Sequence, residues 1–115
     1  MTLPSFVLIG AAKSGTSSLY AYLRDHPDVF MSQRKELQYF CAPFASEPWL
    51  ESTLERGQDW YEAQFAEAGS ATAIGEASTH YTLHPASTGT AARMAATIPE
   101  AKLIYLMRHP VERAL

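Results

Sequence analysis

The segment FVLIGAAKSGTSSLYAYL, residues 6–23, constrains the fold of this 115-residue chain more than any other. A short apolar run over residues 5–9 has the composition of a buried strand and ends at Gly10. A loop of small residues follows. The pattern then predicts a helix over residues 16–25, which opens with serines as caps and ends before Pro27.

Strand and helix patterns alternate along the rest of the chain. Residues 32–40 mix charged and aromatic side chains and predict a loop that enters a short helix. The other predicted elements are strands at residues 29–31, 72–78 and 102–107, and helices at residues 50–68, interrupted near Gly57, and at residues 85–98. This alternation predicts an α/β fold with a parallel sheet and right-handed crossovers.

The composition fits a globular protein and argues against several classes. Hydrophobic residues make up 47% and charged residues 18%, and the net charge of −3 argues against whole-chain binding to nucleic acid or to an anionic membrane. Cys41 is the single cysteine, so an internal disulfide is excluded, and we expect a buried thiol and no metal site. Trp60, Tyr61 and Phe65 are expected in the core.

The length suits one domain, over residues 1–115. The final residues, AKLIYLMRHPVERAL, read as a strand, a turn and one turn of helix, and such a short helix leaves its apolar face unpaired. We therefore expect a single domain that is truncated at its C-terminal end. No apolar run reaches membrane-spanning length and no secretory signal is present at the start, so the default expectation is a cytoplasmic protein.

The loop after the first strand nearly matches the P-loop pattern G-x-x-x-x-G-K-[ST]. Gly10 and Gly15 have the required spacing and Ser17 fills the last place, but Thr16 stands where the lysine should be. The lysine of this loop is Lys13 instead. In ATP and GTP enzymes the P-loop lysine reaches the β- and γ-phosphates, so its displacement weakens that interpretation.

The loop nevertheless has the chemistry of an anion site. Glycines let backbone N–H groups approach a ligand, and the following helix directs its positive end into the loop. Ser14 and Ser18 add hydroxyl donors and Lys13 adds a mobile positive charge. A lysine inside the loop suits a shorter anhydride, a 5′-phosphosulfate, which requires no metal.

Four blocks of the sequence resemble sulfotransferases that use 3′-phosphoadenosine-5′-phosphosulfate (PAPS). They occur in the family's order and are IGAAKSGTSSLYAYLRDHPDV, KELQYF, IGEASTHYTLHP and KLIYLMRHPVERAL. The nearest group is the bacterial carbohydrate type, which is related to heparan sulfate sulfotransferases. The resemblance implies the N-terminal part of a P-loop NTPase-like three-layer fold with a central parallel sheet, and PAPS as the sulfuryl donor.

The resemblance also implies roles for the donor-binding residues. Lys13 would be catalytic, contacting the bridging oxygen and the transferring sulfuryl group as charge builds on the leaving phosphate. Arg108 would bind the 3′-phosphate, because a guanidinium can contact two oxygens at once. The residues that would surround the 5′-phosphate are Ser14, Gly15, Thr16, Ser17 and Ser18.

Glu36 is the candidate general base. It matches the catalytic glutamate of carbohydrate sulfotransferases, and a carboxylate within hydrogen-bond reach of an acceptor hydroxyl can remove its proton. The structural alternative is a solvated charge that pairs with Arg34 or Lys35. Gln38 is a weaker candidate, for orienting the acceptor hydroxyl.

The segment IGEASTHYTLHP contains three further candidate residues. Glu76 and Ser78 belong to the GEAS block, which lies near the acceptor cleft in the family that the chain resembles. His80 could face that cleft, but a lone histidine without spaced ligand partners is more often a surface residue.

Three functions are compatible with these residues. The first is a sulfotransferase that acts on a hydroxyl or amine acceptor, of carbohydrate, lipid or small-molecule type, with carbohydrate favoured. The second is a P-loop kinase or NTPase relative, which would require Mg²⁺ and an aspartate at the end of an apolar strand. The third is a non-catalytic nucleotide-binding fragment.

Overall fold

The computed structural model describes residues 2–11, 14–41, 52–82 and 89–107. Four parallel strands form one sheet in the order β2-β3-β1-β4. The strands are β1 (Phe6–Gly10), β2 (Val29–Met31), β3 (Ala73–Ala77) and β4 (Lys102–Tyr105). The helices are α1 (Thr16–Asp25), α2 (Gln58–Ala63) and α3 (Thr90–Thr97), with 3-10 turns η1 (Leu54–Arg56), η2 (Ala66–Ala68) and η3 (Thr79–Thr82).

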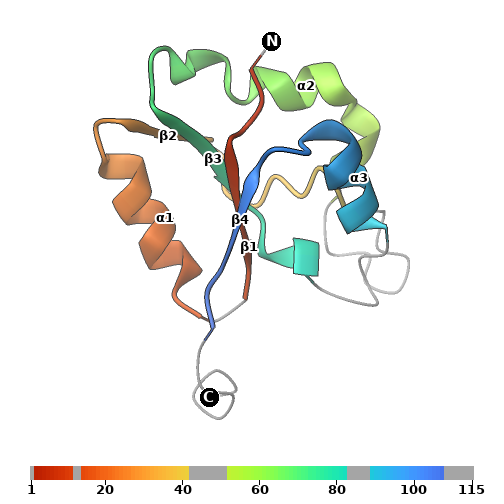
Figure 1. Cartoon of the computed structure of the whole chain (residues 1–115), viewed down its shortest axis with the longest axis horizontal. Coiled ribbons are helices and arrows are strands. Elements are labelled where there is room, and N and C mark those ends of the chain that lie inside the picture. The colour runs from red at the N-terminus through yellow and green to blue at the C-terminus, as the bar shows by residue number, and fades with distance from the viewer. Residues whose placement is uncertain (1, 12–13, 42–51, 83–88, 108–115) are drawn as a thin grey trace.

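The sheet is covered on both faces. Helix α1 lies on one side and α2 and α3 lie on the other (Figure 1). Alternate residues of β1 face the two sides, because side chains along a strand have a period of two. Phe6 and Leu8 pack with Tyr20 of α1, whereas Val7 packs with Tyr61 of α2 and with residues of α3. The three layers confirm the predicted α/β fold with a central parallel sheet.

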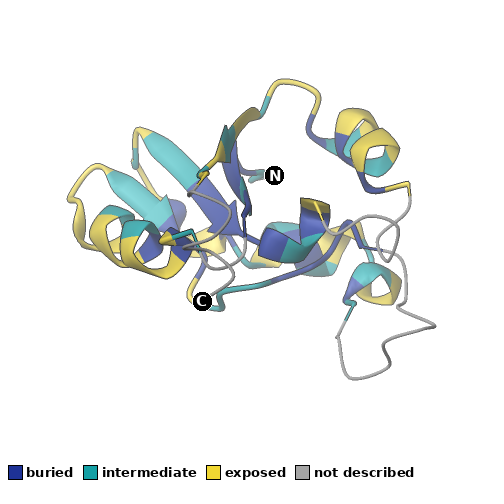
Figure 2. Cartoon of the chain, turned by 90° about the horizontal axis from the view of Figure 1, so that it is seen from below, coloured by how far each residue is buried: buried dark blue, intermediate teal, exposed yellow. Residues whose placement is uncertain are grey.

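Burial follows these layers. Figure 2 shows buried residues along the central strands and on the inward sides of the helices, with exposed residues on their outer sides. Tyr61, Phe65 and Cys41 are fully buried and Trp60 is partly buried against the same cluster, as predicted. No helix in the described parts of the chain is both long enough and apolar enough to cross a bilayer.

Most predicted elements form close to their expected positions. Helix α1 has the predicted bounds, and β2, β3 and β4 lie within the predicted strand ranges. The predicted helix at residues 50–68 is divided at Gly57, whose φ of 86° is unfavourable for other residues. Helix α3 begins after Gly89, and the start predicted at residue 85 lies outside the described residues.

The prediction of a short helix within residues 32–40 is wrong. The chain there forms no helix, only a single hydrogen-bonded turn at residues 39–40, and Glu36 and Gln38 adopt positive φ values of 58° and 55°. Their backbone N–H groups donate to the Ala77 carbonyl and the Ser78 hydroxyl instead of to a helical partner. Contacts with the end of β3 therefore override the local preference for a helix.

Gly75 allows β1 and β3 to pair closely. It is the register partner of Phe6, and a Cβ atom at this position would lie under 3.0 Å from three carbons of the Phe6 ring. We expect Gly75→Ala to lower the free energy of unfolding by about 1–3 kcal/mol, because the buried ring must shift. Urea unfolding of this variant, of Phe6→Leu and of the double variant measures the effect. Additive losses in the double variant would contradict a direct clash between the two positions.

Candidate active site

The candidate residues gather where β1 and β3 end. The loop after β1 leads into α1, η3 follows β3 directly, and residues 32–41 run beside the end of β3. In open parallel sheets, ligands bind outside the carboxyl ends of the strands. The fold therefore places the predicted donor loop and the predicted base at the same edge.

The amino end of α1 is open to an anion. Its N-cap residue is Gly15, which has a left-handed conformation (φ 87°), and its first turn holds no acidic residue. No side chain among the described residues caps the helix, so the predicted serine caps are wrong. The first N–H groups of a helix have no partner within it, and the helix dipole is positive at this end. Ser17 and Ser18 are exposed here, whereas Thr16 is buried.

Lys35 links this helix end to the candidate base. Its ammonium donates a hydrogen bond of 2.7 Å to the Ser17 hydroxyl and lies 3.7 Å from Oε1 of Glu36. The sequence raised Lys35 only as a pairing partner of Glu36. Its contact with Ser17, 18 residues away, has no local sequence signal.

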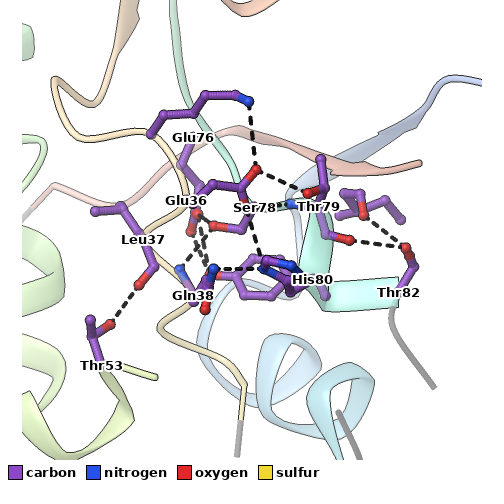
Figure 3. A network of polar contacts seen from close by, with 12 residues as sticks. Glu36, Leu37, Gln38, Thr53, Glu76, Ser78, Thr79, His80 and Thr82 are labelled. Atoms are coloured by element: carbon purple, nitrogen blue, oxygen red, sulfur yellow. Dashed lines mark hydrogen bonds and ion pairs between the residues drawn. The ribbon is translucent and has the colours of Figure 1, made fainter. Parts of the chain in front are cut away.

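The Glu36 carboxylate is held by one residue of η3. The Thr79 backbone N–H donates to Oε2 at 2.8 Å, and the Thr79 hydroxyl donates to Oε1 at 2.9 Å (Figure 3). The side chain keeps 24% of its surface exposed. Two donors fix the direction of the carboxylate, and its remaining lone pairs can face a substrate.

Gln38 and His80 lie beside this carboxylate. The Gln38 amide nitrogen is 2.6 Å from Nδ1 of His80, and the same ring nitrogen is 3.8 Å from Oε2 of Glu36. The two side chains point toward each other in Figure 3. The surface position that the sequence favoured for His80 is wrong, because its ring is half-buried against Gln38. Oε1 of Gln38 is buried and lacks a hydrogen-bond partner among the described residues.

Glu76 forms a second, buried polar cluster behind the site. Its side chain is fully buried and accepts hydrogen bonds from the Ser78 hydroxyl at 2.6 Å, from the Tyr81 hydroxyl at 3.0 Å, and from the Tyr61 hydroxyl. Burial raises the pKa of Glu76 to about 7, although the three hydroxyl donors oppose that rise. Burial and the neighbouring Glu76 also raise the pKa of Tyr61 and Tyr81, so both phenols keep their protons.

This cluster supports the backbone around Glu36. The Ser78 oxygen accepts from the Gln38 N–H at 3.0 Å, and the Tyr81 oxygen accepts from the Tyr39 N–H at 3.1 Å. Each hydroxyl thus donates to Glu76 and accepts from the 36–40 segment. The positive φ values of that segment are unfavourable for residues with a Cβ atom and persist because these contacts hold it.

Some of the predicted site residues lie within the described parts of the chain and others do not. Glu36, Gln38, Glu76 and Ser78 are brought together at the end of β3. Lys13 and Arg108 lie outside the described residues, so their roles stay predictions. Among the residues that the structure describes, no group of three or more His, Cys, Asp or Glu side chains could hold a metal ion.

The chain is similar to known proteins of one family. A model of the Sulfotransferase family matches residues 4–115. The membrane-associated sulfotransferase kil1 of Dictyostelium discoideum is 38% identical over 118 residues, covering 100% of this chain and 22% of that protein. The human bifunctional heparan sulfate N-deacetylase/N-sulfotransferase 3 is 31% identical over 119 residues, covering 97% of this chain and 12% of that protein.

A solved structure shares the fold. The crystal structure of a sulfotransferase from Alicyclobacillus acidocaldarius matches with a TM-score of 0.82 and 37% sequence identity. The match covers 99% of this chain and 48% of that one. The chain thus spans less than half the length of each of these relatives.

Proposed function

Since the chain belongs to the sulfotransferase family, we propose that it binds PAPS at the loop between β1 and α1 and takes part in transferring the sulfuryl group to a hydroxyl or amine. The observation that carries the proposal is the short path from Ser17 through Lys35 to Glu36. This path places a fixed carboxylate beside an uncapped helix end that suits a phosphate.

In the proposed reaction, the acceptor oxygen or nitrogen attacks the sulfur atom of PAPS while Glu36 takes the acceptor's proton. The bond from sulfur to the attacking acceptor atom forms, and the bond from sulfur to the bridging oxygen breaks. The electron pair of that bond stays on the 5′-phosphate, which leaves as adenosine 3′,5′-bisphosphate. Lys13 would stabilise this charge, and the N–H groups and hydroxyls of residues 14–18 would hold the phosphate.

The proposed acceptor is a carbohydrate. Support comes from the relatives named for heparan sulfate N-sulfotransferase activity, which match almost the whole chain at about 30% identity. Gln38 would orient the acceptor. Its Oε1 is buried and lacks a hydrogen-bond partner among the described residues. The nitrogen of the same amide contacts Nδ1 of His80, which also lies near the Glu36 carboxylate. An acceptor N–H or O–H at Oε1 of Gln38 would satisfy its hydrogen-bonding capacity.

Calorimetric titration with adenosine 3′,5′-bisphosphate tests the donor site. We expect metal-independent binding, weakened about 10-fold to 100-fold in Lys13→Ala and in Arg108→Ala, because each removes a charge-assisted hydrogen bond. ATP with Mg²⁺ is the comparison ligand. Mg²⁺-dependent ATP binding without bisphosphate binding would instead favour a kinase or NTPase relative.

A further inference from the structure

We propose that Lys35 is a second lysine of the donor site and that its ammonium binds the sulfuryl end of the phosphosulfate. The inference rests on the proposed function and deepens it. It assigns a catalytic role to a residue that the sequence presented only as a salt-bridge partner of Glu36.

The position of the ammonium is the first argument. It lies 2.7 Å from the hydroxyl of Ser17, in the first turn of α1, and 3.7 Å from Oε1 of Glu36. A donor phosphate at the helix end and an acceptor hydroxyl at the carboxylate would have the moving sulfuryl group between them. Lys35 therefore lies beside the path that the group must follow.

The second argument concerns the hydrogen-bonding capacity of the ammonium. It has three N–H donors, of which one is used by Ser17. The 3.7 Å separation from Glu36 is longer than a hydrogen bond, so this contact is an ion pair without a direct N–H···O bond. Donors thus remain for the sulfuryl oxygens, and the four-carbon stem lets the ammonium move toward them.

The third argument is that a structural role alone would be weak. Half-exposed ion pairs contribute little to stability, and the Lys35 side chain keeps 31% of its surface exposed. Removing the charge should therefore leave the fold intact. A cation beside the transferring group, in contrast, stabilises charge directly where it is redistributed.

The test compares two ligands that differ by the sulfuryl group. Affinities for PAPS and for adenosine 3′,5′-bisphosphate are measured by calorimetry for the wild type, for Lys35→Met and for the control Lys102→Met. Lys102 is exposed at the start of β4, the strand end opposite the site. We expect Lys35→Met to lose about 10-fold in PAPS affinity and less than about threefold in bisphosphate affinity, and the control to match the wild type.

Two results would overturn the inference while leaving the proposed function intact. One is an equal loss of affinity for both ligands, and the other is no loss relative to Lys102→Met. If the wild type binds neither ligand, the proposed function itself fails. Lys35→Gln keeps an N–H donor for Ser17 without the charge, and it gives the same comparison should the methionine variant not fold.

Discussion

Glu36→Gln should abolish sulfuryl transfer and leave donor binding unchanged. Glutamine has the size of glutamate and keeps an oxygen that can accept from Thr79, but it cannot take the acceptor's proton. We expect the transfer rate to fall by about 10²–10⁴-fold, the usual contribution of a general base. The assay follows radiolabelled sulfuryl transfer from PAPS to an unsulfated amino-sugar polysaccharide.

The matched control for this variant is Glu67→Gln. Glu67 is exposed in η2, so its substitution is the same chemical change at a position away from the site. Its transfer rate should equal that of the wild type. A Glu36→Gln rate above about one tenth of the wild-type rate would contradict the role of general base, and a loss of bisphosphate affinity would indicate a structural role instead.

The second large effect is expected at Glu76. Glu76→Ala leaves the hydroxyls of Tyr61, Ser78 and Tyr81 without their buried acceptor. Each buried unsatisfied group costs about 1–3 kcal/mol, so the free energy of unfolding should fall by about 3 kcal/mol or more. Urea unfolding measures the loss. Glu100→Ala, the same chemical change at an exposed position, should have an effect within about 0.5 kcal/mol.

The raised pKa of Glu76 also predicts that the free energy of unfolding depends on pH. Burial raises its pKa from the ordinary 4.5 to about 7 in the folded chain, so the folded state binds the proton more tightly than the unfolded state does. Its stabilising contribution is complete below pH 4.5 and is lost as the pH rises to about 7, with a size on the order of 3 kcal/mol.

Glu76→Gln separates this contribution from those of other groups. Glutamine does not titrate, so the variant should lack the part of the stability loss between pH 5 and pH 8 that belongs to Glu76. Urea unfolding of both proteins at the two pH values gives the difference. Parallel losses in wild type and variant would show that Glu76 does not titrate in this range.

Much of the fold could be predicted from the sequence because its signals are local. The apolar run before Gly10 and the helix that stops before Pro27 depend on neighbouring residues, and both form at the predicted positions. The same local pattern indicated an anion site at the start of α1, and Glu36 as a base came from the KELQYF block.

The site itself depends on contacts that no local pattern contains. Thr79 holds Glu36 from 43 residues away, and Ser17 meets Lys35 from 18 residues away. Glu36 and Gln38 take positive φ values because β3 and the Glu76 cluster supply hydrogen-bond partners to the backbone of residues 36–40.

By itself, then, the sequence determined the family, the layered parallel sheet and the position of the loop between β1 and α1, because strand hydrophobicity, glycine spacing and helix-ending prolines act over a few residues. Only the tertiary structure decided how the Glu36 carboxylate is held and which lysine stands beside it. Both features follow from the pairing of β3 with its neighbours, which brings polar groups that are distant in the sequence to one edge of the sheet, where most of the buried ones find hydrogen-bond partners.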